Sequence, residues 1–303
     1  MERNNLKKYL KILLKLTISG GALVFVFHKV NIDQVIRLYS SSHVLLLGGG
    51  LILFIISKLI SAIRLNSLFR NISIYISNVR NFQLYILGMF YNIFLPGSIG
   101  GDGYKMIFLK KRYTIKTKIL AGSILVDRTS GIVALTTLAL IFLLGISEVH
   151  QFLVFIIIAI PVIIGIYFLG IHLLFPHFKK IFFRIIGYSF GVQGAQVLCA
   201  LLILFALGIH EHMYDYLFLF LVSSLVSIIP FTIGGAGARE LTFLYGAKFL
   251  GIHIDTAIAL SLMFYIITVL VSLCGSYYLL HPIQVKEQPE SSLQDFSGQA
   301  DIT

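Results

Sequence analysis

Long stretches of apolar residues constrain the fold of this chain more than any other feature. A helix that crosses a bilayer needs about 20 mostly apolar residues, and several stretches of the sequence meet that requirement. They are Ile12–Val30, Val44–Ile63, Ile119–Ile146, Phe152–Leu174, Ile185–Leu207 and Ala257–Leu280. The chain is therefore predicted to be an all-α, polytopic membrane helix bundle with about six crossing helices.

The composition agrees with this prediction. Of the 303 residues, 57% are hydrophobic and only 12% are charged, whereas a soluble domain has about 25% charged residues. A soluble enzyme and a disordered chain are therefore excluded as the main interpretation. Cys199 and Cys274 both lie in apolar stretches, so neither a disulfide framework nor a thiolate metal centre is expected.

The basic residues gather on one side of the predicted helices. Lys and Arg are enriched in the cytoplasmic loops of membrane proteins. We therefore place the N-terminus in the cytoplasm and assign most basic residues, including Lys58 and Arg64, to cytoplasmic segments. The exceptions are Lys29, Arg37 and Lys248 on the opposite side, and Arg128 and Arg239 within the membrane. This distribution predicts an inner-membrane protein with both termini in the cytoplasm. The net charge of +11 therefore indicates contact with an anionic membrane surface, and no nucleic-acid partner is expected.

Two further apolar segments, Asn81–Lys105 and Tyr214–Ile252, are each interrupted by a proline and a cluster of glycines. The interruptions read PGSIGGDGYK from Pro96 to Lys105 and PFTIGGAGAR from Pro230 to Arg239. The proline, the isoleucine and three glycines are identical in register, and two further positions are conservative. This similarity indicates an internal duplication.

The flanking residues predict how each interrupted segment enters the membrane. Basic residues lie on both sides of the first segment, whereas the second is flanked by His210–Asp215 and His253–Asp255. The first is therefore predicted to be a re-entrant hairpin from the cytoplasmic face, and the second a re-entrant hairpin from the opposite face. About three crossing helices separate them, so the copies form an inverted repeat. Inverted repeats with discontinuous helices near the midplane are typical of transporters.

Glycine-rich backbone at membrane depth predicts a polar cavity, because its polar groups need protein or water as partners. N–H groups at the start of a half-helix attract anions, and glycine lets the backbone approach a ligand. The alternative is that the glycines only permit close packing of helices. Asn92 is expected to cap a carbonyl that Pro96 frees.

Charged side chains within the apolar segments mark the same candidate site. An intramembrane charge costs at least about 2.5–3.5 kcal/mol, so such groups are expected to face the interior and to pair. The guanidinium groups of Arg128 and Arg239 suit phosphate, with Lys105 as a third cation. The acids, Asp102, Asp127 and Glu240, would balance these cations or meet a cationic head group. The alternatives are purely structural ion pairs and, for Asp102 and Lys105, solvated loop charges.

The complete set of candidate lipid- and head-group-binding residues combines both kinds of feature. It is Asn92, Pro96, Gly97, Ser98, Gly100, Gly101, Asp102, Lys105, Asp127, Arg128, Gly131, Pro230, Thr232, Gly234, Gly235, Gly237, Arg239 and Glu240. No catalytic residue, metal ligand or cofactor is expected. His210, Glu211 and His212 lie in a predicted outer loop without a fourth ligand, and are interpreted as solvated.

Three motifs carry a resemblance to a known family. They are Asn92-x-x-Leu95-Pro96-Gly97 with Gly100-Gly101-Asp102, then Asp127-Arg128-x-x-Gly131, and then Pro230-x-x-x-Gly234-Gly235-x-Gly237-x-Arg239-Glu240. In this order they resemble the lysylphosphatidylglycerol synthase transmembrane-region family, over roughly residues 10–280. Lys105 would correspond to a basic residue that the family usually has after its GGD motif. A lysine there keeps the positive charge but lacks the planar guanidinium group of arginine, which can donate two parallel hydrogen bonds to a phosphate.

The resemblance implies lipid handling. A phospholipid, an aminoacylated phospholipid or a polyprenyl-linked lipid would be moved between leaflets, with membrane lipids as the partners. Two-domain members have a soluble, aminoacyl-tRNA-using domain after the membrane region. This sequence ends about 20 polar residues after its last apolar stretch, so lysyl transfer is not expected of it.

The predicted organisation is a membrane domain over residues 1–283 and a disordered cytoplasmic tail over residues 284–303. The leading functional hypothesis is a flippase-like lipid translocase with a polar cavity at the midplane. Two alternatives stay open: a membrane-embedded enzyme that modifies a lipid head group, and a scaffold subunit for a glycosyltransferase. A separate lipid-modifying enzyme and a second copy of the chain stay open as partners.

Overall fold

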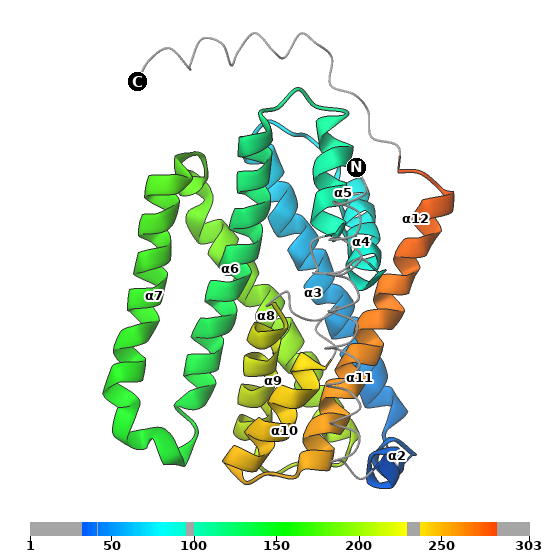
Figure 1. Ribbon diagram of the computed structural model, residues 1–303, viewed down its shortest axis with the longest axis vertical. Coiled ribbons are helices and arrows are strands. Elements are labelled where there is room, and N and C mark those ends of the chain that lie inside the picture. Colours follow the sequence, from blue (N-terminus) through cyan, green and yellow to red (C-terminus); the bar gives the residue numbers. More distant parts are fainter. Residues whose placement is uncertain (1–31, 41, 95–99, 229–236, 284–303) are drawn as a thin grey trace, which may run out of the picture.

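The computed structural model describes residues 32–40, 42–94, 100–228 and 237–283, and within these residues it is helical without strands (Figure 1). The α-helices are α2 (Ile32–Ser40), α3 (Val44–Asn71), α4 (Asn78–Phe94), α5 (Gly100–Lys110), α6 (Thr117–Leu143), α7 (Leu153–Leu174), α8 (Phe182–Ala206), α9 (Met213–Ile228), α10 (Ala238–Leu250), α11 (Ile254–Leu273) and α12 (Tyr277–Leu280). Short 3-10 turns are η1 (Ser147–Phe152), η2 (Pro176–Ile181) and η3 (Cys274–Ser276).

Helices long and apolar enough to cross a membrane account for most of the described residues. They are Val44–Asn71, Thr117–Leu143, Leu153–Leu174, Pro176–Ala206 and Ile254–Leu280, and each overlaps most of a stretch that the sequence predicted. The remaining predicted span, Ile12–Val30, and the predicted tail, 284–303, lie outside the described residues. The prediction of an all-helical, multi-pass membrane protein is confirmed.

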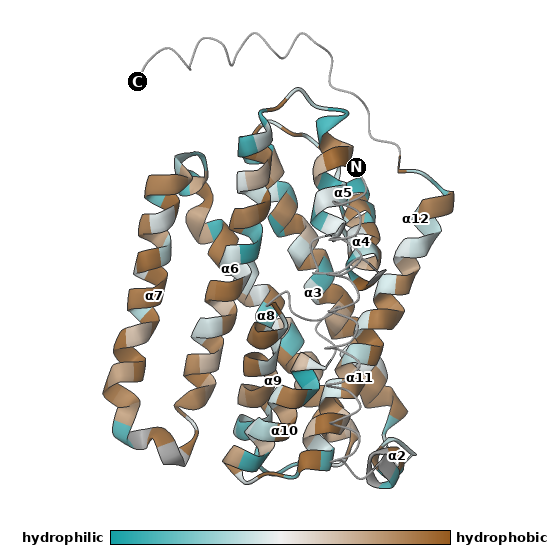
Figure 2. Ribbon diagram, in the orientation of Figure 1, coloured by the Kyte–Doolittle hydropathy of each residue, from teal (hydrophilic) through white to brown (hydrophobic). Residues whose placement is uncertain are grey.

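Helix α7 shows why the bundle suits a bilayer. It is apolar on all sides, and only Ile156 and Ile171 are buried. Large side chains such as Phe155 and Ile166 are exposed, and apolar residues cover the helix surface (Figure 2). An exposed apolar surface of this extent is favourable against lipid tails and unfavourable in water.

Helix α3 continues to Asn71, beyond the predicted end at Ile63. Lys58 and Arg64 therefore lie within the helix, and their assignment to a cytoplasmic segment was wrong. The physical reason is that Arg64 is buried against protein. A charged residue that has a partner inside the bundle does not mark the edge of the membrane.

The buried apolar residues form two clusters, one toward each end of the bundle. The first includes Phe54, Phe220 and Phe264, and the second includes Phe69 and Phe182. Along α3, Arg64 lies between Phe54 and Phe69. The buried charges are thus near the level at which the two apolar clusters meet.

Two pairs of short helices lie at opposite ends of the bundle (Figure 1). Helices α4 and α5 pack side by side at one end, and α9 and α10 pack side by side at the other. In both pairs the first helix runs toward the middle of the molecule and the second runs back. The three long helices α6, α7 and α8 come between the pairs in sequence. The connections, residues 95–99 and 229–236, lie outside the described residues.

The loops at the two ends of the bundle differ in charge. The end that holds α4 and α5 carries most of the described basic residues: Arg70, Arg80, Lys110, Lys111, Arg112, Lys116, Lys118, Lys179, Lys180 and Arg184. The other end carries Asp33, Arg37, Glu211, Asp215, Lys248 and Asp255. This separation gives the bundle a basic end and a mixed, partly acidic end.

Candidate functional site

Eight charged residues lie in the inner part of the described bundle, away from the loops at its two ends. They are Lys58 and Arg64 on α3, Asp102 and Lys105 on α5, Asp127 and Arg128 on α6, and Arg239 and Glu240 on α10. We refer to them as the interior charged residues. All except Lys58 and Arg64 were candidates from the sequence.

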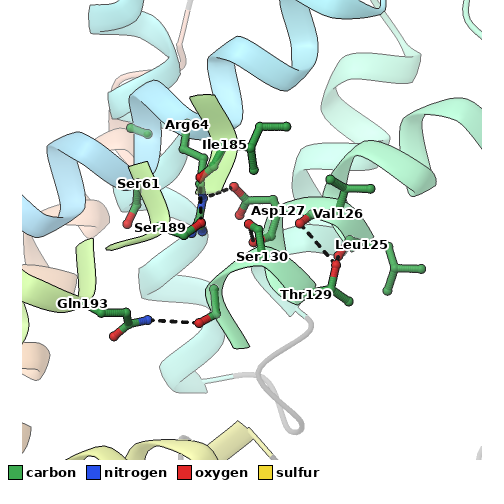
Figure 3. Close-up of polar contacts among 12 residues, drawn as sticks. Ser61, Arg64, Leu125, Val126, Asp127, Thr129, Ser130, Ile185, Ser189 and Gln193 are labelled. Carbon is green, nitrogen blue, oxygen red and sulfur yellow. Dashed lines mark hydrogen bonds and ion pairs between the residues drawn. The ribbon is translucent and has the colours of Figure 1, made fainter. Parts of the chain in front are cut away.

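Arg64 and Asp127 form a buried ion pair between α3 and α6 (Figure 3). Arg64 Nε donates to Asp127 Oδ1 over 2.8 Å, and Arg64 Nη1 donates to Ser189 Oγ on α8 over 2.9 Å. The guanidinium group also packs against α6 one turn after Asp127, where a Cβ at Gly131 would be in ordinary van der Waals contact with Nη1, at 3.5 Å. The pair therefore fixes three helices to one another. Charge-assisted hydrogen bonds of this kind are among the strongest in proteins.

Sequence reasoning missed Arg64, although α3 contains a signal that could have found it. Ser57, Ser61 and Arg64 are all buried, and their spacing places them on one face of a helix. A polar face on an otherwise apolar helix indicates contact with protein and not with lipid.

Asp102 joins α5 to α6. It accepts hydrogen bonds from Lys105 Nζ, over 3.2 Å, and from Arg128 Nε. Lys105 is buried, and its ammonium group also lies 4.6 Å from the ring centre of Tyr85. Asp102 and Lys105 are therefore parts of the packed interior, and the interpretation as solvated loop charges is wrong.

Asp127 and Arg128 point to different partners although they are adjacent in sequence. Consecutive residues on an α-helix project about 100° apart, so Asp127 contacts Arg64 on α3 while Arg128 contacts Asp102 on α5. Arg128 is the more accessible of the two arginines: 34% of its side chain is exposed, against 7% for Arg64. Of these two, Arg128 is better placed to meet a ligand.

Asn92 caps the start of α5 from the neighbouring helix α4. Its Oδ1 accepts the hydrogen bond of the Gly101 N–H over 2.8 Å. The predicted role, capping of a carbonyl that Pro96 frees, is not what the described contacts show. The amide occupies an N–H group that would otherwise lack a partner at the helix start.

The glycines of α5 have different surroundings. A Cβ at Gly101 would lie 2.0 Å from the carbonyl oxygen of Gly88 on α4, so the alternative of close helix packing holds there. A Cβ at Gly103 would have no neighbour within 4 Å among the described residues. Gly101 therefore serves packing, whereas Gly103 leaves space beside Asp102. The candidates in the two connections, Pro96, Gly97, Ser98, Pro230, Thr232, Gly234 and Gly235, lie outside the described residues.

Glu240 fixes the start of α10. Its Oε2 accepts from the Gly237 N–H over 2.7 Å, and its Oε1 accepts from Ser261 Oγ on α11 over 3.2 Å. Gly237 has a φ of 85°, a left-handed conformation that favours glycine. Glu240 is therefore engaged in holding the helix start in place.

Arg239 does not pair with Glu240. No carboxylate of the described residues lies within 4.0 Å of Arg239, and its Nε has no hydrogen-bond partner there. Only 8% of the residue is exposed. Its Nη2 donates to Ser224 Oγ on α9 over 3.2 Å. The interpretation as a structural ion pair therefore fails for Arg239, and the guanidinium group keeps the capacity to bind an anion.

The arrangement is suited to holding an anionic group inside an apolar bundle. Among the interior charged residues the cations, on α3, α5, α6 and α10, outnumber the carboxylates. The described part of the chain has no group of three or more His, Cys, Asp or Glu side chains that could hold a metal ion.

The comparisons with known proteins agree with the fold. The family model described as lysylphosphatidylglycerol synthase TM region matches residues 12–187 and 177–275. A UPF0104 membrane protein of Pyrococcus horikoshii is 23% identical over 310 residues, which cover 84% of this chain and 90% of that protein. No solved structure matches the chain. With its apolar helices and a family match over most of its length, the chain belongs to the lysylphosphatidylglycerol synthase TM region family of multi-pass membrane proteins.

Proposed function

We propose that this protein moves a phosphate-containing lipid from one membrane leaflet to the other. The observation that carries the proposal is the set of interior charged residues, which lie on the two oppositely placed pairs of short helices and on the long helices α3 and α6. Charged groups inside a membrane are costly and usually mark the path of a substrate or ion. A lipid head group that crosses the bilayer needs such polar partners along its way.

The lengths of the short helices support two re-entrant hairpins. Helix α5 has 11 residues and α10 has 13, which correspond to about 16 and 20 Å of rise. The hydrocarbon core of a bilayer is about 30 Å thick. Helices of this length are too short to cross the core alone, so each pair would turn back within the membrane and bring its connection near the midplane. With three long helices between the pairs, the two hairpins would form an inverted repeat.

The charge of the two ends supports an orientation. The basic end, which holds the outer ends of α4 and α5, would face the cytoplasm because positive loops stay on that side. The first hairpin would then open to the cytoplasm and the second to the outside. Both chain termini would be cytoplasmic, in the inner membrane.

The surface of the second hairpin supports a path for the lipid tail. An apolar groove of about 530 Å³ lies between α9 and α10, lined by residues that include Val222, Leu241 and Tyr245. Arg239 is on the same helix, on its buried side. An acyl chain in this groove would stay in contact with lipid and protein while the phosphate meets the interior cations.

Reconstitution in liposomes tests the proposal. A fluorescent phospholipid in the inner leaflet becomes accessible to an added quencher only if the protein moves it outward. We expect Arg128→Ala and Arg239→Ala to abolish this movement, and the exposed control Lys180→Ala to retain it. Movement unchanged by both interior variants would refute the assignment. A chemically modified lipid, detected by mass spectrometry, would instead indicate a head-group-modifying enzyme.

A further inference from the structure

Two interior cations of the described bundle have no carboxylate partner. No described carboxylate lies within 4.0 Å of either Lys58 or Arg239. The three interior carboxylates are engaged elsewhere: in ion pairs between α3 and α6 and between α5 and α6, and at the start of α10. The connections over residues 95–99 and 229–236 contain no charged residue, so they supply no counter-charge either.

Lys58 and Arg239 flank one cluster of aromatic rings. The Lys58 ammonium group lies 4.4 Å from the ring centre of Phe54. The Arg239 guanidinium carbon lies 4.8 Å from the ring centre of Phe264 and 5.6 Å from that of Phe220. Phe264 is edge-on to both other rings, with centroid distances of 5.4 Å to Phe54 and 4.7 Å to Phe220. We call these five residues the cation–aromatic cluster.

The cluster joins helices that are far apart in sequence. Phe54 and Lys58 come from α3, Phe220 from α9, Arg239 from α10 and Phe264 from α11. Lys58 and Arg239 are linked through two rings in contact, Phe54 and Phe264. The cluster therefore connects the second hairpin with the Arg64–Asp127 pair deeper along α3.

Among the described residues, no anionic group balances the two positive charges of the cluster. Aromatic faces attract a cation, but less strongly than a carboxylate does in a dry interior. Lys58 and Arg239 carry like charges, which repel, and the buried Arg239 Nε has no hydrogen-bond partner among the described residues. An anion that contacts both would relieve the repulsion and satisfy the orphan donor.

We propose that Lys58 and Arg239 bind the phosphate of a lipid whose head group is net negative, and that the same two charges exclude an aminoacylated head group. This inference rests on the proposed function and names its substrate class. An added ammonium group would meet two cations, while the described carboxylates already have partners. Discrimination by repulsion of this kind is a common source of specificity.

Lipid binding to the purified full-length protein tests the inference without any transport. The probes are phosphatidylglycerol, polyprenyl phosphate, phosphatidylethanolamine and lysylphosphatidylglycerol, each presented in nanodiscs of otherwise zwitterionic lipid. We expect phosphatidylglycerol or polyprenyl phosphate to bind at least about tenfold more tightly than lysylphosphatidylglycerol. Their relative affinities identify which source of phosphate the site accepts.

Substitutions at Lys58 test the role of the cluster. We expect Lys58→Met to weaken binding of the anionic lipid by about tenfold and to reduce the discrimination against the lysylated lipid. Lys58→Arg should restore both, and the exposed control Lys179→Met should change neither. Thermal unfolding of each variant checks that it is folded. If Lys58→Met does not fold, competition between the two lipids on the wild-type protein decides the question.

The outcomes separate the inference from the proposed function. Equal or tighter binding of lysylphosphatidylglycerol overturns the inference, and so does a folded Lys58→Met variant with unchanged affinity and selectivity. Binding of anionic lipid without movement in liposomes would refute the proposed function and leave the inference standing. Movement of lysylated and anionic lipid at the same rate would refute the inference and leave the transport function standing.

Discussion

Removing one partner of the Arg64–Asp127 pair should destabilise the protein strongly. The two side chains are 7% and 12% exposed and are joined over 2.8 Å. Asp127→Asn keeps the size of the side chain but leaves the Arg64 charge buried without a counter-charge. Loss of one member of a buried pair costs about 3–5 kcal/mol, because the remaining ion pays its desolvation without compensation.

The double variant shows whether the charge is responsible. Arg64→Met with Asp127→Leu removes both charges and replaces them with apolar groups of similar size. We expect its unfolding free energy to exceed that of Asp127→Asn by at least about 1 kcal/mol, since replacement of a whole buried pair is often nearly neutral. The assay is equilibrium unfolding in mixed micelles, followed by circular dichroism. A loss of less than about 0.5 kcal/mol in Asp127→Asn, a size typical of surface positions, would refute the description of this pair as buried and mutually compensating.

Four further substitutions test the two hairpins by the same unfolding assay. Gly101→Ala should cost about 1–3 kcal/mol by forcing α5 away from α4. The matched change Gly103→Ala, which meets open space, should be neutral or stabilise by up to about 1 kcal/mol; equal effects at the two positions would contradict the close contact at Gly101. Asn92→Ala should cost about 1 kcal/mol through loss of the cap on α5, and an unchanged midpoint would show that the cap contributes nothing. Gly237→Ala should cost about 1–2 kcal/mol because of its positive φ, and full stability would contradict that conformation.

The long helices could be predicted because a membrane span leaves a simple signal. About 20 apolar residues in sequence suffice to identify one, and the described helices overlap every predicted stretch except Ile12–Val30, which lies outside the described residues. The ends were less accurate. Helix α3 continues past Arg64 because that residue has a partner inside the bundle, and a sequence window cannot distinguish a paired charge from a charge at the membrane edge.

The burial of the charged candidates could be predicted from the sequence, but their partners could not. Asp102, Asp127 and Arg239 are all in the interior, as expected for charges within apolar segments. The prediction could not identify Arg64 as the partner of Asp127, because the two are distant in sequence and meet only when α3 packs against α6. Lys58 was missed for the same reason. Its ring contact, Phe54, is one turn away on α3, but the link through Phe264 on α11 to Arg239 on α10 forms only when these helices pack together.

Labelling of single cysteines from each side of the membrane tests most directly whether the two short-helix pairs are opposed re-entrant hairpins. In a background with Cys199 and Cys274 replaced by serine, cysteines are placed at the exposed positions Ser77 and Thr114, which flank the first pair, and Glu211 and His253, which flank the second. We expect an impermeant thiol reagent to label Ser77→Cys and Thr114→Cys only from the cytoplasmic side, and Glu211→Cys and His253→Cys only from the opposite side. Labelling of Ser77→Cys and Thr114→Cys from different sides would show that α4 and α5 together cross the membrane, and would contradict the account.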